Sequence, residues 1–374
     1  MNQIRQNNVR LLGNDLVINE DSCNLGCEYC LTGQSNLKSA HAEQLIFQPP
    51  RVDRYDKTAP FGQRLHNIIE RVADNLGAPL LKLTGGEIFI IKGIFDFIEE
   101  IAPNHAVLVL QTNALPLTDD RLERLAKIDN VVLQITLDSS VYKGNSYRVG
   151  ALSLHEKLLK RTRAAVASGI PLEIYTVLTD RSVEHLEPFV AWCDAFPENK
   201  PQFMPFPVRG PDSERFKVRP DQYHHIDNLR ELREKHPAVM PPSAYVERLI
   251  SFYRSNGREW RCHLPRLVIS SFSDGVTTAC PNIWFNDMGN IAQSEWRTVL
   301  EQVCNTGFYD LLLSPRPRLT ACKNCLTPWD TLSLYFEDEI TLDELCLAPT
   351  YNHPEIRELL INEKKRYQMD AKAG

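Results

Sequence analysis

Segments with the pattern of strands and segments with the pattern of helices alternate over residues 16–208, and this alternation constrains the fold most. Apolar runs typical of buried strands lie at residues 16–18, 79–87, 106–114, 130–140, 171–180 and 201–208. Helical periodicity occurs between them, at 62–76, 92–102, 119–128, 152–169 and 183–196. This order predicts an α/β fold with a parallel sheet. Six such units in roughly 190 residues are too few for a closed eight-stranded barrel, although periodicity alone also permits a doubly wound open sheet.

Composition narrows the class of protein. Hydrophobic residues make up 43% and charged residues 24% of the 374 residues, as in ordinary globular proteins. A net charge of -6 provides no basic surface for nucleic acid. The chain shows no signal peptide and no apolar run long enough for a membrane span, so we expect a cytoplasmic protein without a nucleic-acid or membrane partner. Ten cysteines in a reducing compartment are better explained as metal ligands than as disulfides.

Polar residues collect where the predicted strands end. Cys23, Cys27 and Cys30 follow the first strand with the spacing C-x3-C-x2-C, and neither a histidine nor a fourth cysteine lies close by. Thiolates favour iron–sulfur clusters and zinc, and three of them leave one metal position open, whereas a closed structural site has four ligands. The next three strands end in Gly85-Gly86-Glu87, Gln111-Thr112-Asn113 and Asp138-Ser139-Ser140. Because ligands bind at the carboxyl ends of parallel strands, these groups are expected to meet at one rim.

The cysteine loop, followed one strand–helix unit later by Gly-Gly-Glu, resembles the radical S-adenosylmethionine (radical SAM) enzymes. The resemblance implies a partial (β/α)6 barrel, a [4Fe-4S] cluster on the three cysteines, and S-adenosylmethionine on the open iron. It also implies an electron donor of the flavodoxin or ferredoxin type. In that family the Gly-Gly-Glu motif, here Gly85, Gly86 and Glu87, holds the methionyl amine of the cofactor. A zinc knuckle that borrows a distant ligand is the structural alternative for the cysteines.

Five further residues are candidates for binding the cofactor or the substrate. Polar side chains at the ends of the third and fourth strands suit a ribose, a carboxylate or the substrate, and they equally suit a hydrogen-bond network inside the barrel. These residues are Gln111, Asn113, Asp138 and Ser139. Arg148 is similar to an arginine that related enzymes use near the cofactor carboxylate, and the alternative is a solvated surface arginine. No acid–base residue is identified; His224 and His225 lie in a predicted linker.

A second group of cysteines lies in the last third of the chain. Cys262 and Cys280 flank a predicted hairpin that turns at Ser273-Asp274-Gly275, and Cys322 and Cys325 form a C-x2-C pair. Four thiolates fit zinc or a fully ligated cluster. The arrangement resembles the "twitch" and SPASM extensions of radical SAM enzymes, which implies an auxiliary [4Fe-4S] cluster. The longer SPASM pattern has cysteines where Thr331 and Tyr335 stand here, so one cluster of the shorter twitch type is expected.

These features predict four parts and one main function. The parts are a barrel over residues 1–209, a linker with helices over 210–257, a small cysteine-rich β-hairpin and helix domain over 258–350, and a C-terminal helix or tail over 351–374. Cys304 and Cys346 remain unassigned, and Cys193 is expected to be a buried small hydrophobe.

The resemblance implies an enzyme that forms a 5'-deoxyadenosyl radical and abstracts a substrate hydrogen. Oxidative tailoring of a small sugar-like or aminocyclitol-like molecule is the favoured reaction. One alternative is modification of a ribosomal precursor peptide, for which leader recognition would need a separate protein, since only 22 residues precede Cys23. The other is a non-catalytic metal-binding scaffold, which would need no Gly-Gly-Glu motif.

Overall fold

The computed structural model describes residues 11–18, 22–30, 53–210, 213–283, 289–293 and 307–373. Eight strands within these residues form one sheet in the order β6-β5-β4-β3-β2-β1-β7-β8. The first six are β1 (Gly13–Ile18), β2 (Leu80–Gly85), β3 (Val107–Thr112), β4 (Val131–Thr136), β5 (Leu172–Leu178) and β6 (Gln202–Pro207). Each pairs in parallel with its neighbour. The α/β class and the parallel sheet expected from the sequence are confirmed.

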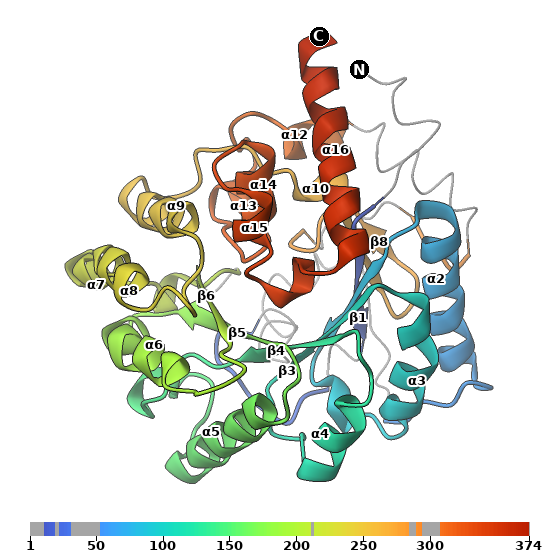
Figure 1. Ribbon diagram of the computed structural model, residues 1–374, viewed down its shortest axis with the longest axis horizontal. Helices are drawn as coiled ribbons and strands as arrows, with labels where there is room; N and C mark the ends of the chain where they lie inside the picture. Colours follow the sequence, from blue (N-terminus) through green and yellow to red (C-terminus); the bar gives the residue numbers. More distant parts are fainter. Residues whose placement is uncertain are drawn as a thin grey trace.

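Helices cover the outside of this curved sheet (Figure 1). They are α2 (Pro60–Leu76), α3 (Ile94–Ile101), α4 (Asp119–Leu125), α5 (Leu152–Ala167) and α6 (Leu186–Asp194). In α2, proline occupies the first turn and Gly77 ends the helix in the left-handed conformation (φ 60°), where its N–H donates to the carbonyl of Ala73. Leu65, Ile68 and Val72 recur at helical spacing and are buried against the sheet.

The predicted hairpin is present, and it joins the main sheet. Its strands β7 (Val268–Phe272) and β8 (Thr277–Thr278) are antiparallel to each other. Strand β7 also pairs in parallel with β1, with Gly13 opposite Val268 and Val17 opposite Phe272. The sequence predicts the hairpin but not the pairing of β7 with β1, because main-chain hydrogen bonds between distant strands do not require particular residue types. The cysteine-rich part therefore extends the barrel sheet at the β1 edge.

The remaining α-helices of the described residues follow β6. Between β6 and β7 these are α7 (Tyr223–Asp227), α8 (Leu229–Lys235), α9 (Ser243–Arg254) and α10 (Leu264–Leu267). After β8 they are α12 (Gly307–Leu312), α13 (Thr320–Lys323), α14 (Asp330–Phe336), α15 (Leu342–Leu345) and α16 (Pro354–Ala373). None of the described helices is both long and apolar enough to cross a bilayer.

Candidate functional site

A cavity of about 210 Å³ opens at the carboxyl ends of the strands. All three cysteines of the first loop line it, together with Gly85 and Gly86. Gln111 and Asn113 from the end of β3 and Arg148 from the segment after β4 line it too. The structure therefore brings together side chains that are up to 125 residues apart in the sequence, and the rim expected from the strand ends exists.

The cysteine loop contacts the end of the barrel, and its thiols are exposed or partly exposed. Cys23 is exposed, and Cys27 and Cys30 are partly buried. Asn113 Nδ2 lies 3.8 Å from Cys23 Sγ. Burial raises the pKa of Cys27 to about 12, although the nearby guanidinium of Arg148 acts in the opposite direction. A thiol in that state ionises when a metal ligates it, so a metal cluster would suit this loop.

Arg148 lies beside the cysteine loop in a buried polar network. Its Nη2 donates to Tyr29 Oη at 2.6 Å and to Asp138 Oδ1 at 3.2 Å, and Tyr29 donates to the other oxygen of Asp138. Its Nη1 is 3.7 Å from Cys27 Sγ. The Nε atom is buried without a hydrogen-bond partner in the described residues. The surface alternative for Arg148 is wrong, because only 7% of the residue is exposed.

Gly85 and Gly86 present main chain to the cavity, and Glu87 turns away from it. Gly85 has a φ of 144°, and a Cβ there would lie 1.7 Å from the carbonyl oxygen of Ile18. The Glu87 carboxylate is fully buried and accepts hydrogen bonds from Asn113 N at 2.7 Å and Thr112 Oγ1 at 2.8 Å. Burial raises its pKa to about 7, although these hydrogen bonds oppose the shift. Glu87 thus joins the ends of β2 and β3.

Two predicted site residues lie behind the cavity wall. Asp138 and Ser139 are buried and are not among the described residues that line the cavity. Asp138 Oδ1 also accepts a hydrogen bond from Val177 N at 3.1 Å. Asp138 therefore orients Tyr29 and Arg148. A direct contact of Asp138 or Ser139 with the cofactor stays a prediction.

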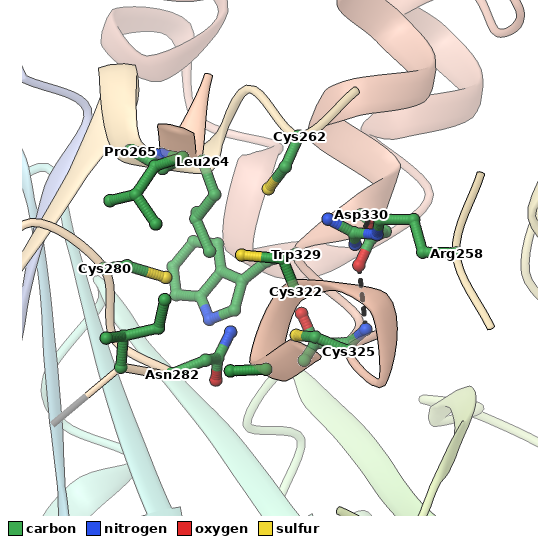
Figure 2. A pocket seen from close by; sticks show the side chains of 14 residues that line it. Arg258, Cys262, Leu264, Pro265, Cys280, Asn282, Cys322, Cys325, Trp329 and Asp330 are labelled. Atoms are coloured by element: carbon green, nitrogen blue, oxygen red, sulfur yellow. Dashed lines mark hydrogen bonds and ion pairs between the residues drawn. The ribbon is translucent and has the colours of Figure 1, made fainter. Parts of the chain in front are cut away.

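The second group of cysteines surrounds a separate pocket (Figure 2). Its lining contains Cys262, Cys280, Cys322 and Cys325, with the Arg258 guanidinium and the Asp330 carboxylate on one side. Among the residues that the structure describes, no three His, Cys, Asp or Glu side chains are grouped closely enough to hold one metal ion. The four thiols are arranged around a pocket instead.

Two further cysteines, Cys193 and Cys346, line neither of these pockets. Cys193 is fully buried, as expected for a small hydrophobe. Cys346 is also buried, and its Sγ lies 3.3 Å from the carbonyl oxygen of Tyr351. Cys304 lies outside the described residues.

The sequence did not predict three charged residues that line the deeper part of the cavity. Asp15 on β1, Lys82 on β2 and Arg209 after β6 all line its wall. The signal for two of them was present, since a charged residue inside an apolar strand pattern, as in Leu-Leu-Lys-Leu, is unusual for a buried strand. Tertiary structure is needed to show that both face the same cavity.

Comparison with known proteins agrees with this geometry. Residues 21–193 match the family model described as Radical SAM superfamily. This part of the chain is a radical SAM domain. A GTP 3',8-cyclase of Geobacter sulfurreducens is 30% identical over 155 residues, which cover 40% of this chain and 41% of that protein. A second GTP 3',8-cyclase, from Hydrogenovibrio crunogenus, is 32% identical over 154 residues and covers 41% of its length. The chain thus spans about two-fifths of the curated relatives that it matches.

Solved structures extend the likeness of fold to most of the chain. The protein anSMEcpe with bound AdoMet superimposes with a TM-score of 0.62 at 14% identity, covering 91% of this chain and 99% of that one. Streptococcus suis SuiB bound to S-adenosylmethionine gives a TM-score of 0.57 at 17% identity, covering 85% of this chain and 71% of that one. At these identities the likeness concerns the fold. The partial barrel of radical SAM type is confirmed.

The residues on the rim fit the cofactors that a radical SAM domain implies. Three thiols on one loop would supply soft ligands for three irons of a [4Fe-4S] cluster and would leave the fourth iron open to the cavity. Beside them, the main chain at Gly85 and Gly86 and the unpartnered Nε of Arg148 suit the polar end of S-adenosylmethionine.

Proposed function

We propose that the chain is a radical SAM enzyme that tailors a small polar molecule by abstracting a hydrogen atom from carbon. The observation that carries this proposal is the single cavity that holds the three-cysteine loop, the two glycines and, deeper down, a set of buried charges. The bound cluster and S-adenosylmethionine would supply the 5'-deoxyadenosyl radical. The protein positions the substrate carbon and excludes water.

The residues of the rim have separate tasks under this proposal. Cys23, Cys27 and Cys30 ligate the cluster, and Asn113 Nδ2 lies near one of these sulfurs. Gly85 and Gly86 let the methionyl part of the cofactor approach the main chain. Arg148, held by Asp138 and Tyr29, offers a guanidinium next to the loop. A flavodoxin or ferredoxin would provide the electron.

The second group of cysteines is proposed to hold an auxiliary [4Fe-4S] cluster, with zinc as the alternative. Three residues, Asn282, Thr327 and Trp329, line both its pocket and the main cavity. The two pockets therefore share part of their wall. Under this proposal, a cluster in the second pocket would accept an electron from a substrate radical in the main cavity, which would give a net oxidation.

A peptide substrate is the second candidate. SuiB bound to its precursor peptide SuiA has a TM-score of 0.56 with this chain, at 16% identity, which makes the fold compatible with such a substrate. The depth of the cavity and its buried charges favour a small molecule. A metal-binding scaffold without activity is the third reading of the same cysteines.

Iron content and S-adenosylmethionine cleavage test the proposal together. Anaerobically reconstituted protein should hold about eight irons, and a Cys23/Cys27/Cys30→Ala variant about four, since each cluster has four irons. With dithionite, the parent should form 5'-deoxyadenosine and the triple variant none. Cys193→Ala is the matched control, because that buried cysteine lies in neither group.

Each outcome of this experiment decides a different point. Iron in both proteins without 5'-deoxyadenosine in the parent would favour the scaffold. About four irons in the parent, near none in the variant, and zinc present would retain the radical enzyme and remove the auxiliary electron acceptor. Iron absent from both would overturn the proposal.

A further inference from the structure

Two opposite charges face each other deep in the cavity. Asp15 and Lys82 are paired across the neighbouring strands β1 and β2, and both line the cavity wall. They are 6% and 4% exposed. Each lies three residues before the end of its strand, which places them about 10 Å below the rim. They therefore lie beneath the cysteine loop and the glycines.

Neither charge is satisfied within the described part of the protein. Asp15 Oδ1 is buried and has no hydrogen-bond partner. The Lys82 ammonium makes no hydrogen bond or ion pair with any described residue; its near neighbours are the rings of Tyr175 at 5.4 Å and Trp329 at 5.6 Å. Burial of a charge costs free energy unless a group of opposite charge or a hydrogen-bond partner compensates it. Such a pair in a cavity points to a ligand that supplies both partners.

Other charges in this region already have partners. Glu173 Oε2 accepts from Gln134 Nε2 at 2.8 Å and its Oε1 from Thr350 N at 3.0 Å. Arg209 donates to the side chain of Asn282. Of these four charged groups, the two without a hydrogen bond or ion pair to a described residue are therefore the Asp15 carboxylate and the Lys82 ammonium.

The charge balance indicates a ligand with separated charges and no net charge. Burial raises the pKa of Asp15 and lowers that of Lys82, and the charge of Arg209 acts on both groups. Glu173 acts on Lys82 as well. The two acids and the two bases that act on this pair sum to zero, so a ligand with a net charge would leave one charge unbalanced.

We propose that Asp15 and Lys82 bind a zwitterionic group of the substrate. The ammonium of this group would contact the Asp15 carboxylate, and its carboxylate or phosphodiester would contact Lys82 between the rings of Tyr175 and Trp329. Charge-assisted hydrogen bonds of this kind are stronger than neutral ones. The inference rests on the proposed function, in which S-adenosylmethionine occupies the rim and the substrate lies below it.

The test uses four small probes and needs no turnover. Saturation-transfer NMR titrations are run on the reconstituted protein with saturating S-adenosylmethionine, so that the methionyl site is filled. L-Serine and glycerophosphoethanolamine carry an ammonium with a carboxylate or a phosphodiester, and neither has a net charge. Propionate and ethanolamine carry one charge each. Serine or glycerophosphoethanolamine should bind the parent at least about tenfold more tightly than either singly charged probe, and comparison of the two identifies the anionic group.

Variants assign the contacts. Lys82→Met and Asp15→Asn should each weaken zwitterion binding at least about tenfold. The matched controls Lys127→Met and Asp129→Asn change exposed residues and should bind as the parent does. The double variant Asp15→Asn/Lys82→Met should melt at or above the midpoint of the parent, because it removes two buried charges without hydrogen bonds.

The results separate this inference from the proposed function. Equal binding of all four probes, or zwitterion binding that survives both substitutions, would overturn it. So would a double variant that melts well below the parent, since the pair would then be structural. Absence of 5'-deoxyadenosine in the parent would remove the proposed function, while the probe titrations would still decide whether the pair binds a zwitterion.

Discussion

The buried ion pair between Arg258 and Asp330 should be essential for the stability of the region around the second cysteine group. Arg258 donates to Asp330 Oδ1, and Asp330 Oδ2 accepts from Thr327 N at 2.8 Å. The two side chains are 2% and 3% exposed. Asp330→Asn keeps the size of the side chain and leaves the guanidinium charge uncompensated. Loss of one partner of a buried pair costs about 3–5 kcal/mol.

That cost converts into a measurable shift of the melting temperature. With an unfolding entropy of about 2.1 cal/mol/K per residue, the 374 residues of the chain give about 0.8 kcal/mol/K. Asp330→Asn should therefore lower the midpoint of thermal unfolding by about 4–6 °C. The midpoint is measured by circular dichroism on variants of equal iron content. The double variant Arg258→Met/Asp330→Asn should recover at least half of this loss, since it leaves no unpaired buried charge.

An exposed ion pair provides the control. Arg230 donates two hydrogen bonds to Glu247, at 2.6 and 2.7 Å, and the two side chains are 52% and 53% exposed. Exposed pairs contribute about 0–1 kcal/mol, so Glu247→Gln should shift the midpoint by about 1 °C or less. If Asp330→Asn shifts it no more than Glu247→Gln does, the argument from burial is refuted.

Two further predictions concern the rim of the cavity. Gly85→Ala should abolish soluble expression or cofactor binding, because its Cβ would lie 1.7 Å from the Ile18 carbonyl oxygen. Gly150→Ala is the control: no atom lies within 4 Å of the added Cβ, so this variant should behave as the parent in both assays. Burial raises the pKa of Glu87 from 4.5 to about 7. The protonated carboxyl therefore contributes stability below pH 4.5 that is lost as the pH rises through about 7, a decline of about 3 kcal/mol. Glu87→Gln should flatten the fall of the melting temperature between these pH values; a parallel pair of pH profiles would contradict the assignment.

Much of the barrel could be predicted because its signals are local. Parallel strands buried on both faces are mostly apolar along their length, as in Val-Leu-Val-Leu at the start of β3, where all four residues are buried. The helices between them carry one apolar face, and the cysteine spacing and the Gly-Gly-Glu motif are contiguous. Their meeting at one rim followed from the rule that strand ends of a parallel sheet lie on one side.

Features that depend on contacts between distant residues could not be predicted. The pairing of β7 with β1 uses main-chain groups that every residue has. The sequence left Arg148 open between the surface and the site. Its burial beside the Asp138 carboxylate excludes the surface, and its contact with the cofactor stays a prediction. The Gly-Gly-Glu motif predicts that Glu87 contacts the cofactor. In the structure its carboxylate is buried and accepts a hydrogen bond from Asn113 N, which follows β3.

The sequence by itself thus determined the order of strands and helices, the three-cysteine loop and the second set of four cysteines, because residue type and spacing carry that information. Tertiary structure decided that Asp15 and Lys82, on separate strands, share one cavity beneath the rim. It also decided that Trp329 lies between this cavity and the second cysteine group. The physical reason is that burial, charge balance and hydrogen-bond satisfaction are properties of the assembled environment, to which residues from the whole chain contribute.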